Sequence, residues 1–570
     1  MNKSKVFLVI LILTIFITYS PLLNTEFWAD DYLHIERIKL LGTSALFKDF
    51  FTAWILKSSD TPTWWTSPAI ELQYFRPLIS LSFFMDILLW DIKPMGFHLT
   101  NIIFHILTSI LIFRLATFIF KENLTAFLIA LIFGIHPCHM EAVAWICCRT
   151  DVIAGFFYYF SLFTFLKFRQ EKEKRHFPLF PFSLILYICA LLSKEMAITL
   201  PLVLIVFDRL YSSGEKDSYS LYIRIKKSIL YYLPFFIVTI VYLGIRFKIF
   251  GGLGSVPYPF SHSLLRPGFS FFVFRNMTLY FANILYFIPI DLMVAYPFFV
   301  KHSPLIFLLA GLVAGGIYML SKFTVNKRNA FFLLLSGLFA MLPVSFLSVG
   351  QRFLYIPSGC FFLCLGYIIF KNRPWRKEIL ICYLLLIFFV TQGGNFISYR
   401  IGSYMESIKD TIKTELKDSS SPVELYFIDL PILALIGLPH SLRLECPHIK
   451  FSMEILSVSP DLLPSNNPFY SYIKVPNPYT MIIGQKDKTY FGTYLELAFL
   501  GGEANFDSGR VFIRENFTVT VSKLKNDLPR EFCFTFNSPV TAKNKIFFRG
   551  RNMQVYPVKI KKLMSHHPHL

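Results

Sequence analysis

Long apolar runs alternate with short polar segments over the first four hundred residues of the chain. Each run has about the 17–25 residues that a helix needs to cross a bilayer, and a helix satisfies its own backbone groups there. The pattern predicts eleven spans, at about 6–23, 98–119, 124–136, 151–168, 179–193, 197–210, 229–247, 304–320, 330–347, 353–370 and 379–396. Residues 269–290 are expected to form an interfacial helix, because Arg275 and Asn276 interrupt the run. The fold class predicted is a polytopic α-helical membrane protein.

Basic clusters between the spans predict the orientation of the chain. They are "KFRQEKEKRH" (167–176), "KFTVNKRN" (322–329) and "KNRPWRKE" (371–378), and such clusters mark cytoplasmic loops. The first helix has no small-residue cleavage site after it, so we expect an uncleaved helix with Lys3 and Lys5 in the cytoplasm. Residues 24–97 then form a first external loop. Its tryptophans are expected to lie along the membrane interface, partly on amphipathic helices.

The composition changes after about residue 400. Strand-like alternations appear, such as "FTVTVSKL" (517–524) and "EFCFTF" (531–536), with turn signals between them. We therefore predict two domains, a membrane domain over 1–399 and a small β-rich extracytoplasmic domain over 400–570. Cys446 and Cys533 of the second domain could pair in an oxidising compartment.

The composition supports this class and excludes nucleic acid as the partner. The chain is 54% hydrophobic and 16% charged, against about 25% charged residues in soluble domains. Its formal net charge of +20 would suggest a nucleic-acid binder. However, the positive charges gather in short loops beside the spans, so the lipid bilayer accounts for them.

Charged and polar side chains from distant parts of the sequence map to the outer side of the membrane. Ionisable groups beside spans are often functional. The set is Asp30, Asp31, Arg76, His98, Asn101, His136, His139, Glu141, Arg149, Asp151, Lys194, Glu195, Arg352 and Tyr355. Arginine and lysine suit a lipid phosphate, and a carboxylate beside them could deprotonate a hydroxyl. The set therefore suggests group transfer from a lipid phosphate to an alcohol.

Several stretches resemble a known family of membrane enzymes. The stretches are "WADDYLHI", "YFRPLISLSF", "GFHLTNIIFHIL", "GIHPCHMEAVAWICCRTDVIAG", "LLSKEMAITLPLVLIVFD" and "QRFLYIPS". Together they resemble, over roughly residues 20–370, the membrane half of the transmembrane and tetratricopeptide-repeat protein O-mannosyltransferases, which belong to the GT-C superfamily. The tail has none of that family's tetratricopeptide repeats, and its β-like composition leaves the acceptor open.

The resemblance implies an inverting glycosyltransferase that uses a polyprenyl-phosphate sugar, with a mannose-like sugar favoured. The acceptor would be a hydroxyl of protein Ser/Thr, a glycan or a lipid. Asp30 would be the general base, and Asp31 would orient it or help to hold a divalent cation, Mg²⁺ or Mn²⁺. Arg76, Arg149, Lys194 and Arg352 would bind the lipid phosphate, and the remaining residues of the set would contact the donor. The resemblance implies a bacterial inner membrane, or the endoplasmic reticulum in a eukaryotic host, with the active site outside the cytoplasm.

Several candidates also have a purely structural interpretation. Asp30 and Asp31 could cap a helix, and Arg76 could be an ordinary turn residue before Pro77. The stretch "HPCHMEAVAW", with His136, His139 and Glu141, invites a metal site, but its spacing is not that of a zincin and favours a hydrogen-bond network. Glu195 could neutralise Arg149, and Arg352 could extend to the interface as basic side chains do.

Two other functions remain open at this stage. A transporter or flippase of lipid-linked sugars would place paired inverted repeats and charges near the midplane, whereas the charges here gather at one face. A non-catalytic membrane scaffold with an external binding domain would tolerate loss of Asp30.

Overall fold

A computed structural model shows how these segments are arranged. It describes the chain except for residues 1–2, 53, 58–62, 67–70, 171–177, 213–220, 252–267, 289–301, 348, 368–376, 418–421, 460–470, 487, 492–505, 552 and 565–570. Two of the basic clusters, 167–176 and 371–378, lie largely outside the described residues.

Helices occupy every position at which a span was expected. The apolar helices are α1 (Lys3–Tyr19), α5 (Pro94–Phe120), α6 (Asn123–Ile135), α8 (Arg149–Gln170), α9 (Leu179–Ser193), α10 (Leu200–Ser212), α11 (Leu221–Phe250), α14 (Pro304–Lys322), α15 (Lys327–Met341), α16 (Tyr355–Leu365) and α17 (Lys377–Leu416). Within the described residues, seven helices are long and apolar enough to cross a membrane, or eight if the bent pair around Pro137 is one span. The chain is thus a multi-pass helical membrane protein, and the count of eleven crossings stays a prediction.

Short helical turns join the spans at the end of the bundle that carries the polar residues. They are η1 (Ser20–Asn24), η3 (Pro137–His139), α7 (Met140–Ala144), η4 (Ile146–Cys148), η6 (Glu195–Thr199), η7 (Leu342–Phe346) and η8 (Gln351–Leu354). Helix α12 (Phe269–Tyr286), the expected interfacial helix, is not among the candidate spans. Its Asn276 donates from Nδ2 to the carbonyl oxygens of Ser345 and Leu347, which ties it to these turns.

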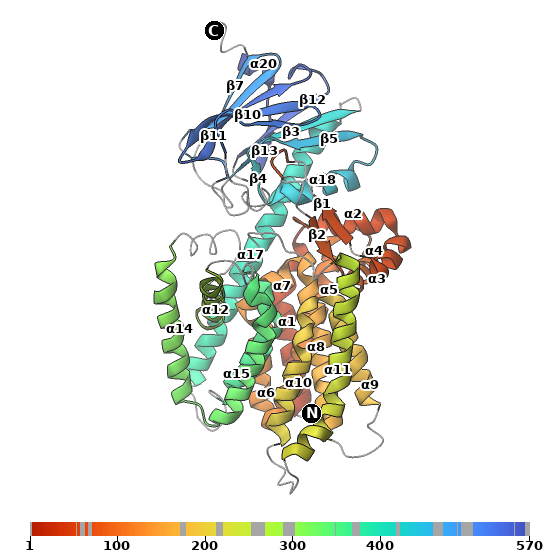
Figure 1. The fold of residues 1–570 in the computed structure, drawn as a ribbon, viewed down its shortest axis with the longest axis vertical. Coiled ribbons are helices and arrows are strands. Elements are labelled where there is room, and N and C mark those ends of the chain that lie inside the picture. Colours follow the sequence, from red (N-terminus) through yellow and green to blue (C-terminus); the bar gives the residue numbers. More distant parts are fainter. Residues whose placement is uncertain are drawn as a thin grey trace.

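The first loop folds into a compact unit at one end of the bundle. It contains α2 (Asp31–Leu41), α3 (Thr43–Phe51), the antiparallel strands β1 (Trp54–Lys57) and β2 (Glu71–Tyr74), and α4 (Pro77–Trp90). In Figure 1 these elements lie between the helical bundle and the β-sheets, and the N-terminus lies at the opposite end of the bundle. The first loop and the C-terminal region are therefore on the same side of the molecule.

The C-terminal region contains β-sheets, as the alternating pattern predicts, but it also contains parallel pairs. Strands β10 (Phe517–Lys525) and β11 (Leu528–Phe536) are the two predicted strands, and they pair antiparallel in a sheet of order β7-β8-β11-β10-β9. A second sheet of order β13-β12-β3-β5 pairs β3 in parallel with both neighbours. The other elements are β3 (Val423–Ile428), β4 (Leu430–Pro431), α18 (Ala434–Glu445), β5 (Phe451–Ile455), β6 (Val458–Ser459), β7 (Ser471–Asn477), β8 (Thr480–Gln485), β9 (Val511–Ile513), β12 (Lys545–Arg551), β13 (Gln554–Pro557) and α20 (Ile560–Met564).

The boundary predicted at residues 399 and 400 lies inside a continuous helix. Helix α17 runs from Lys377 to Leu416 without a break and carries the chain from the bundle into the sheets, as Figure 1 shows. The division into two domains stays a prediction. Cys446 and Cys533 are both free.

Trp64 of the first loop is buried against the C-terminal region, and the interfacial placement of the other tryptophans stays a prediction. Trp64 is 3% exposed, and its ring contacts Phe512 and Phe532 of the five-stranded sheet at 5.0 and 4.9 Å. Its Nε1 donates to the carbonyl of Leu456 at 3.0 Å, and Thr63 forms a bridge with Ile455. The sheet offers Trp64 both apolar contact and a hydrogen-bond acceptor, which suits a buried indole. One hydrophobic cluster therefore contains residues of the first loop and of the C-terminal region.

Replacement of Trp64 by alanine should loosen this shared cluster. We expect the free energy of unfolding to fall by about 3–5 kcal/mol, the range for large aromatic truncations in cores, and thermal unfolding of the full chain in detergent would measure it. Tyr556→Ala, at an exposed position of β13, is the control and should leave the midpoint nearly unchanged. Equal midpoints for the two variants would contradict the docking of the loop.

Candidate active site

The acidic pair lies where the first loop enters helix α2. Ala29, just before the pair, has a φ of 50°, a strained value for a residue with a side chain. Asp31 begins α2 and is fully buried, while Asp30 is half-buried at the N-cap position. The Asp30 side chain makes no capping hydrogen bond. The interpretation of Asp30 as a helix cap is therefore wrong, and its carboxylate is available for another role.

The two carboxylates have different surroundings. Asp31 accepts from the backbone N–H of Cys147 at 2.8 Å and from that of Trp28 at 3.2 Å. Burial nevertheless raises the pKa of Asp31 to about 8. Burial also raises the pKa of Asp30, while the positive charges of Arg352 and His440 lower it. Asp31 thus anchors the loop to the α7–α8 connection, and Asp30 is the carboxylate placed beside a cation.

The raised pKa of Asp31 predicts a pH dependence of stability. The folded chain retains a proton up to about pH 8 that the unfolded chain releases near its ordinary pKa of 3.8. The free energy of unfolding should therefore fall as pH rises between these values, by at most about 1.4 kcal/mol per pH unit. Asp31→Asn, which cannot titrate, should flatten this slope in thermal unfolding between pH 4.5 and 7.5. Exposed Asp507→Asn is the control, and parallel curves for the two variants would contradict the prediction.

Arg76 and Glu195 form an ion pair at the end of the bundle that carries the polar residues. The Nη2 and Nε atoms of Arg76 donate to Glu195 Oε1 and Oε2 at 2.7 and 3.2 Å, a two-pronged contact. Arg246 of α11 is 3.7 Å from Glu195 Oε2 and shares the same carboxylate. Two guanidinium groups thus face one carboxylate, which lowers the pKa of Glu195 and leaves one excess positive charge. Arg246 was not predicted; its only sequence signal is a basic residue near the end of an apolar run.

Arg352 is the cation that lowers the pKa of Asp30 most. Its guanidinium pairs with Glu141, whose other oxygen accepts from the Arg352 backbone N–H at 2.8 Å. The guanidinium also lies over the rings of Trp145 and Phe353, at 5.5 and 4.9 Å. Trp145 in turn stacks on Trp28 at 4.6 Å. Arg352 is thus held at the site by Glu141 and by aromatic faces.

Lys194 and Asp151 form a buried ion pair near Arg76 and Arg352. The Lys194 ammonium contacts Asp151 Oδ2 at 2.5 Å, and both side chains are at most 3% exposed. Burial lowers the pKa of Lys194; Asp151 raises it, and the charges of Arg76 and Arg352 lower it. Lys194 therefore lies within electrostatic range of both arginines. The side chains of Arg76, Arg352 and Arg246 are 15–21% exposed, so these three can be reached by an anion.

One interpretation of the sequence paired Arg149 with Glu195, but the structure pairs Arg149 with Asp86 instead. Its guanidinium is fully buried, pairs with Asp86 at 2.6 Å and lies over Phe83 at 4.3 Å. It also donates to the Phe97 carbonyl at 3.1 Å. These contacts give Arg149 a structural role, and they separate it from the arginines that an anion can reach.

The predicted histidines and their neighbours form buried contacts between helices. His139 contacts the Phe133 carbonyl at 2.7 Å and Ser358 Oγ at 2.8 Å. His136 accepts from the Cys138 N–H, and Asn101 donates to the Val143 carbonyl. Tyr355 bonds His105, a residue that was not predicted, at 2.8 Å. These contacts match the hydrogen-bond network favoured over a metal site. His98 is also fully buried, next to Phe97 in α5.

The described residues do not offer a built site for a divalent cation. No group of three His, Cys, Asp or Glu side chains within that part of the chain could hold a metal ion. Both oxygens of Asp31 are already engaged by backbone N–H groups. The divalent cation that the resemblance implies stays an expectation, and the proposed reaction uses no metal.

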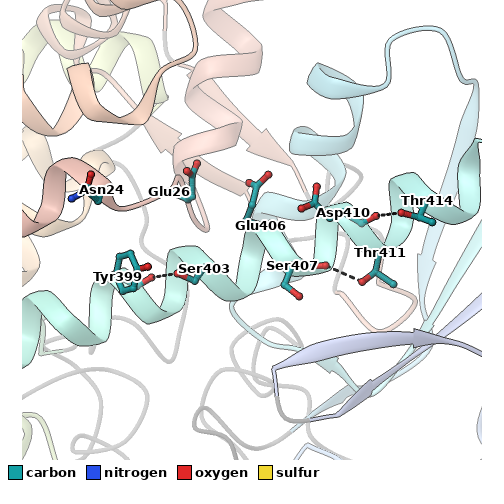
Figure 2. A pocket seen from close by; sticks show the side chains of 9 residues that line it. All are labelled: Asn24, Glu26, Tyr399, Ser403, Glu406, Ser407, Asp410, Thr411 and Thr414. Atoms are coloured by element: carbon teal, nitrogen blue, oxygen red, sulfur yellow. Dashed lines mark hydrogen bonds between the residues drawn. The ribbon is translucent and has the colours of Figure 1, made fainter.

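An open groove of about 580 Å³ lies along helix α17, beside the start of the first loop. Figure 2 shows Glu26, Glu406 and Asp410 along it, with Ser and Thr hydroxyls between them. It contains no lysine or arginine among its lining residues. The acidic lining of this groove does not suit an anionic lipid phosphate. The partly exposed side chains of Arg76, Arg246 and Arg352 suit it better.

Curated proteins with similar sequences are protein O-mannosyl-transferases. The chain is 37% identical over 157 residues to TMTC1 of Mus musculus and 29% identical over 173 residues to TMTC3 of Homo sapiens. These matches cover 26% and 29% of the chain, less than the residues 20–370 over which the resemblance was expected. They confirm the resemblance itself. The matched region makes up only 16% and 18% of these relatives, and no family model matches the chain.

Two solved structures are similar at low identity. ArnT from Cupriavidus metallidurans bound to undecaprenyl phosphate has a TM-score of 0.43 and 12% identity, over 78% of this chain and 85% of that one. The archaeal oligosaccharyltransferase AglB from Archaeoglobus fulgidus, in complex with an inhibitory peptide and a dolichol-phosphate, has a TM-score of 0.40 and 11% identity, over 80% and 65%.

Proposed function

We propose that the chain is an inverting glycosyltransferase that moves a sugar, with mannose favoured, from a polyprenyl-phosphate donor to a hydroxyl acceptor. The single observation that carries this proposal is the placement of Asp30. Its carboxylate is half-buried, makes no capping bond, and lies within the electrostatic range of Arg352. The proposed base and a proposed phosphate-binding cation therefore lie at the same end of a multi-pass bundle. Similarity to protein O-mannosyl-transferases supports the same reaction.

The proposed reaction is a single displacement at the anomeric carbon. Asp30 takes the proton of the acceptor hydroxyl as the oxygen forms its bond to that carbon. The bond from the carbon to the phosphate oxygen breaks, and polyprenyl phosphate leaves with the electron pair. A carboxylate with a raised pKa suits this proton transfer near neutral pH.

The leaving phosphate gains charge as the bond breaks, so cations that face it lower the barrier. Arg352 is proposed for this contact, together with Arg76 and Arg246, because these three side chains are partly exposed. Lys194 and Arg149 are buried in pairs with Asp151 and Asp86. They are proposed to support the site rather than to touch the phosphate.

The proposal extends to the membrane side and the partners. The active site and the C-terminal region would lie outside the cytoplasm, because the N-terminal lysines lie at the other end of the bundle. The acceptor would be a protein Ser/Thr hydroxyl, a glycan or a lipid.

A donor panel tests the proposal. Membranes that contain the full chain are supplied with radiolabelled polyprenyl-phosphate mannose and, in parallel, with other polyprenyl-phosphate sugars, and the labelled products are separated into protein, glycan and lipid fractions. We expect label from one lipid-linked sugar, with mannose favoured. Transport of the intact donor without sugar transfer would instead favour a flippase. If no donor gave a labelled product, the enzyme proposal would be rejected.

A further inference from the structure

Two glycines bring helix backbones against the segment that leads to the acidic pair, residues 26–29. A Cβ at Gly402 of α17 would lie 2.9 Å from the backbone N and O atoms of Glu26, and one at Gly437 of α18 would lie 2.5 Å from the carbonyl oxygen of Ala29. Figure 2 shows Glu26 beside α17. At the other helical glycines of the described chain that have neighbours within 4 Å, the nearest atoms belong to side chains. The segment therefore meets two helices with no side chain between the backbones.

The two helices are also fixed to each other and to helix α2, which follows the acidic pair. Lys409 of α17 donates from Nζ to Glu445 Oε1 of α18 at 2.6 Å. Arg443 of α18 donates from Nε to Oε1 of Glu36 at 2.6 Å, and Glu36 of α2 is 6% exposed. The Lys409 ammonium lies over the ring of Tyr32, also in α2, at 5.0 Å. Helices α17 and α18 thus hold the chain both before and after the acidic pair.

The same segment contacts the bundle through its side chains and through the acidic pair. Trp28 stacks on Trp145 at 4.6 Å, and Asp31 accepts from the backbone N–H of Cys147 at 2.8 Å. Ala29 has a φ of 50°, and a strained backbone of this kind persists only where its surroundings hold it. The bundle and the two glycine-bearing helices together provide that hold.

We propose that Gly402 and Gly437 are positioning residues that place Asp30, so that α18 and the end of α17 belong to the catalytic unit. This role rests on the proposed function. A methyl group at either position would overlap backbone atoms, which forces the segment 26–29 or the helix to shift. A shift of about 1 Å near the reacting atoms can lower a rate by about 10²-fold. Both glycines therefore act through Asp30, and neither touches a substrate.

The chain offers a matched control for substitutions at these positions. Gly393 is in the same helix as Gly402, and a Cβ there would have nothing within 4 Å. Alanine is more favourable than glycine inside a helix, so Gly393→Ala should keep the wild-type rate of transfer and an unfolding midpoint at least as high. Gly402→Ala and Gly437→Ala make the same chemical change at the two contacts. A difference from the control therefore reports the contact and not helix propensity.

The first readout does not depend on activity. Hydrogen–deuterium exchange of the purified full chain in detergent is followed by mass spectrometry at the amides of Trp28 and Cys147, which both donate to Asp31. We expect a loss of protection at both amides in Gly402→Ala and Gly437→Ala, and wild-type protection in Gly393→Ala. Helix α8 should keep its protection in all three variants. Wild-type protection at both amides in the two contact variants would overturn the proposal, and so would a loss throughout α8 in both, because the glycines would then stabilise the whole fold.

The second readout is the steady-state rate of sugar transfer. Each contact variant should lower kcat by about 10²-fold and leave the donor KM unchanged, because the arginines proposed for the phosphate are not displaced. The double variant should be no slower than the slower single variant, since both glycines act on one segment. Effects that multiply would contradict a shared role.

The two readouts separate the two proposals. If wild type transfers no sugar, the proposed function fails, and the exchange of the Trp28 and Cys147 amides still decides whether the glycines hold the segment. If both contact variants transfer sugar at the wild-type rate, the proposed function stands and the positioning role is rejected.

Discussion

Asp30→Asn should reduce the rate of sugar transfer by about 10²–10⁴-fold, the range that general bases contribute. The amide has nearly the shape of the carboxylate but cannot take the acceptor proton. The Asp30 side chain makes no capping bond, so the variant should fold and bind the donor normally. The rate constant should therefore fall while donor affinity changes little. Steady-state transfer with purified protein measures both.

Asp91→Asn provides the comparison for this variant. Asp91 belongs to the same loop, and its side chain is 73% exposed in a surface pair with Lys39. Surface pairs contribute little, so this variant should transfer sugar at the wild-type rate. If Asp30→Asn retained the wild-type rate too, Asp30 would not be the base.

Arg149→Met should lower the free energy of unfolding by about 3–5 kcal/mol, because it leaves the Asp86 carboxylate buried without its cation. The double variant Arg149→Met/Asp86→Leu should regain most of that loss, since an apolar pair needs no compensation there. Thr100, which donates to Asp86, already has a second acceptor in the Gly96 carbonyl. Thermal unfolding of each variant in detergent measures the series.

Arg114→Met is the control, because Arg114 is an exposed residue of α5. Its unfolding midpoint should stay near that of wild type. A double variant no more stable than Arg149→Met would contradict a structural pair and would return Arg149 to the candidates for the phosphate.

The sequence predicted the helices and the polar face well because both depend on local pattern. An apolar run marks a helix wherever its partners are, so each of the eleven expected spans contains a helix. Asp30 could be chosen as a candidate because it follows the first span, and Arg352 because it lies in a distinct motif; their roles stay predictions. The strands β10 and β11 could be predicted from their period of two residues.

The pairings across the site could not be predicted, because they depend on how distant elements meet. One interpretation paired Glu195 with Arg149, but the partners of Glu195 come from the start of α4 and the end of α11. Trp64 is in a loop that reads as interfacial, and only the folded chain shows that a sheet formed some four hundred residues later accepts it.

The most direct test of the central claim is the stereochemistry and stoichiometry of one reaction. Purified full chain in liposomes is given polyprenyl-phosphate mannose of defined anomeric configuration and a hydroxyl acceptor, and the glycoside is analysed by NMR while released polyprenyl phosphate is counted. The account predicts an inverted anomeric centre and one polyprenyl phosphate for each sugar transferred. A retained configuration would contradict the single displacement with Asp30 as the base, and sugar transferred without release of polyprenyl phosphate would contradict the donor.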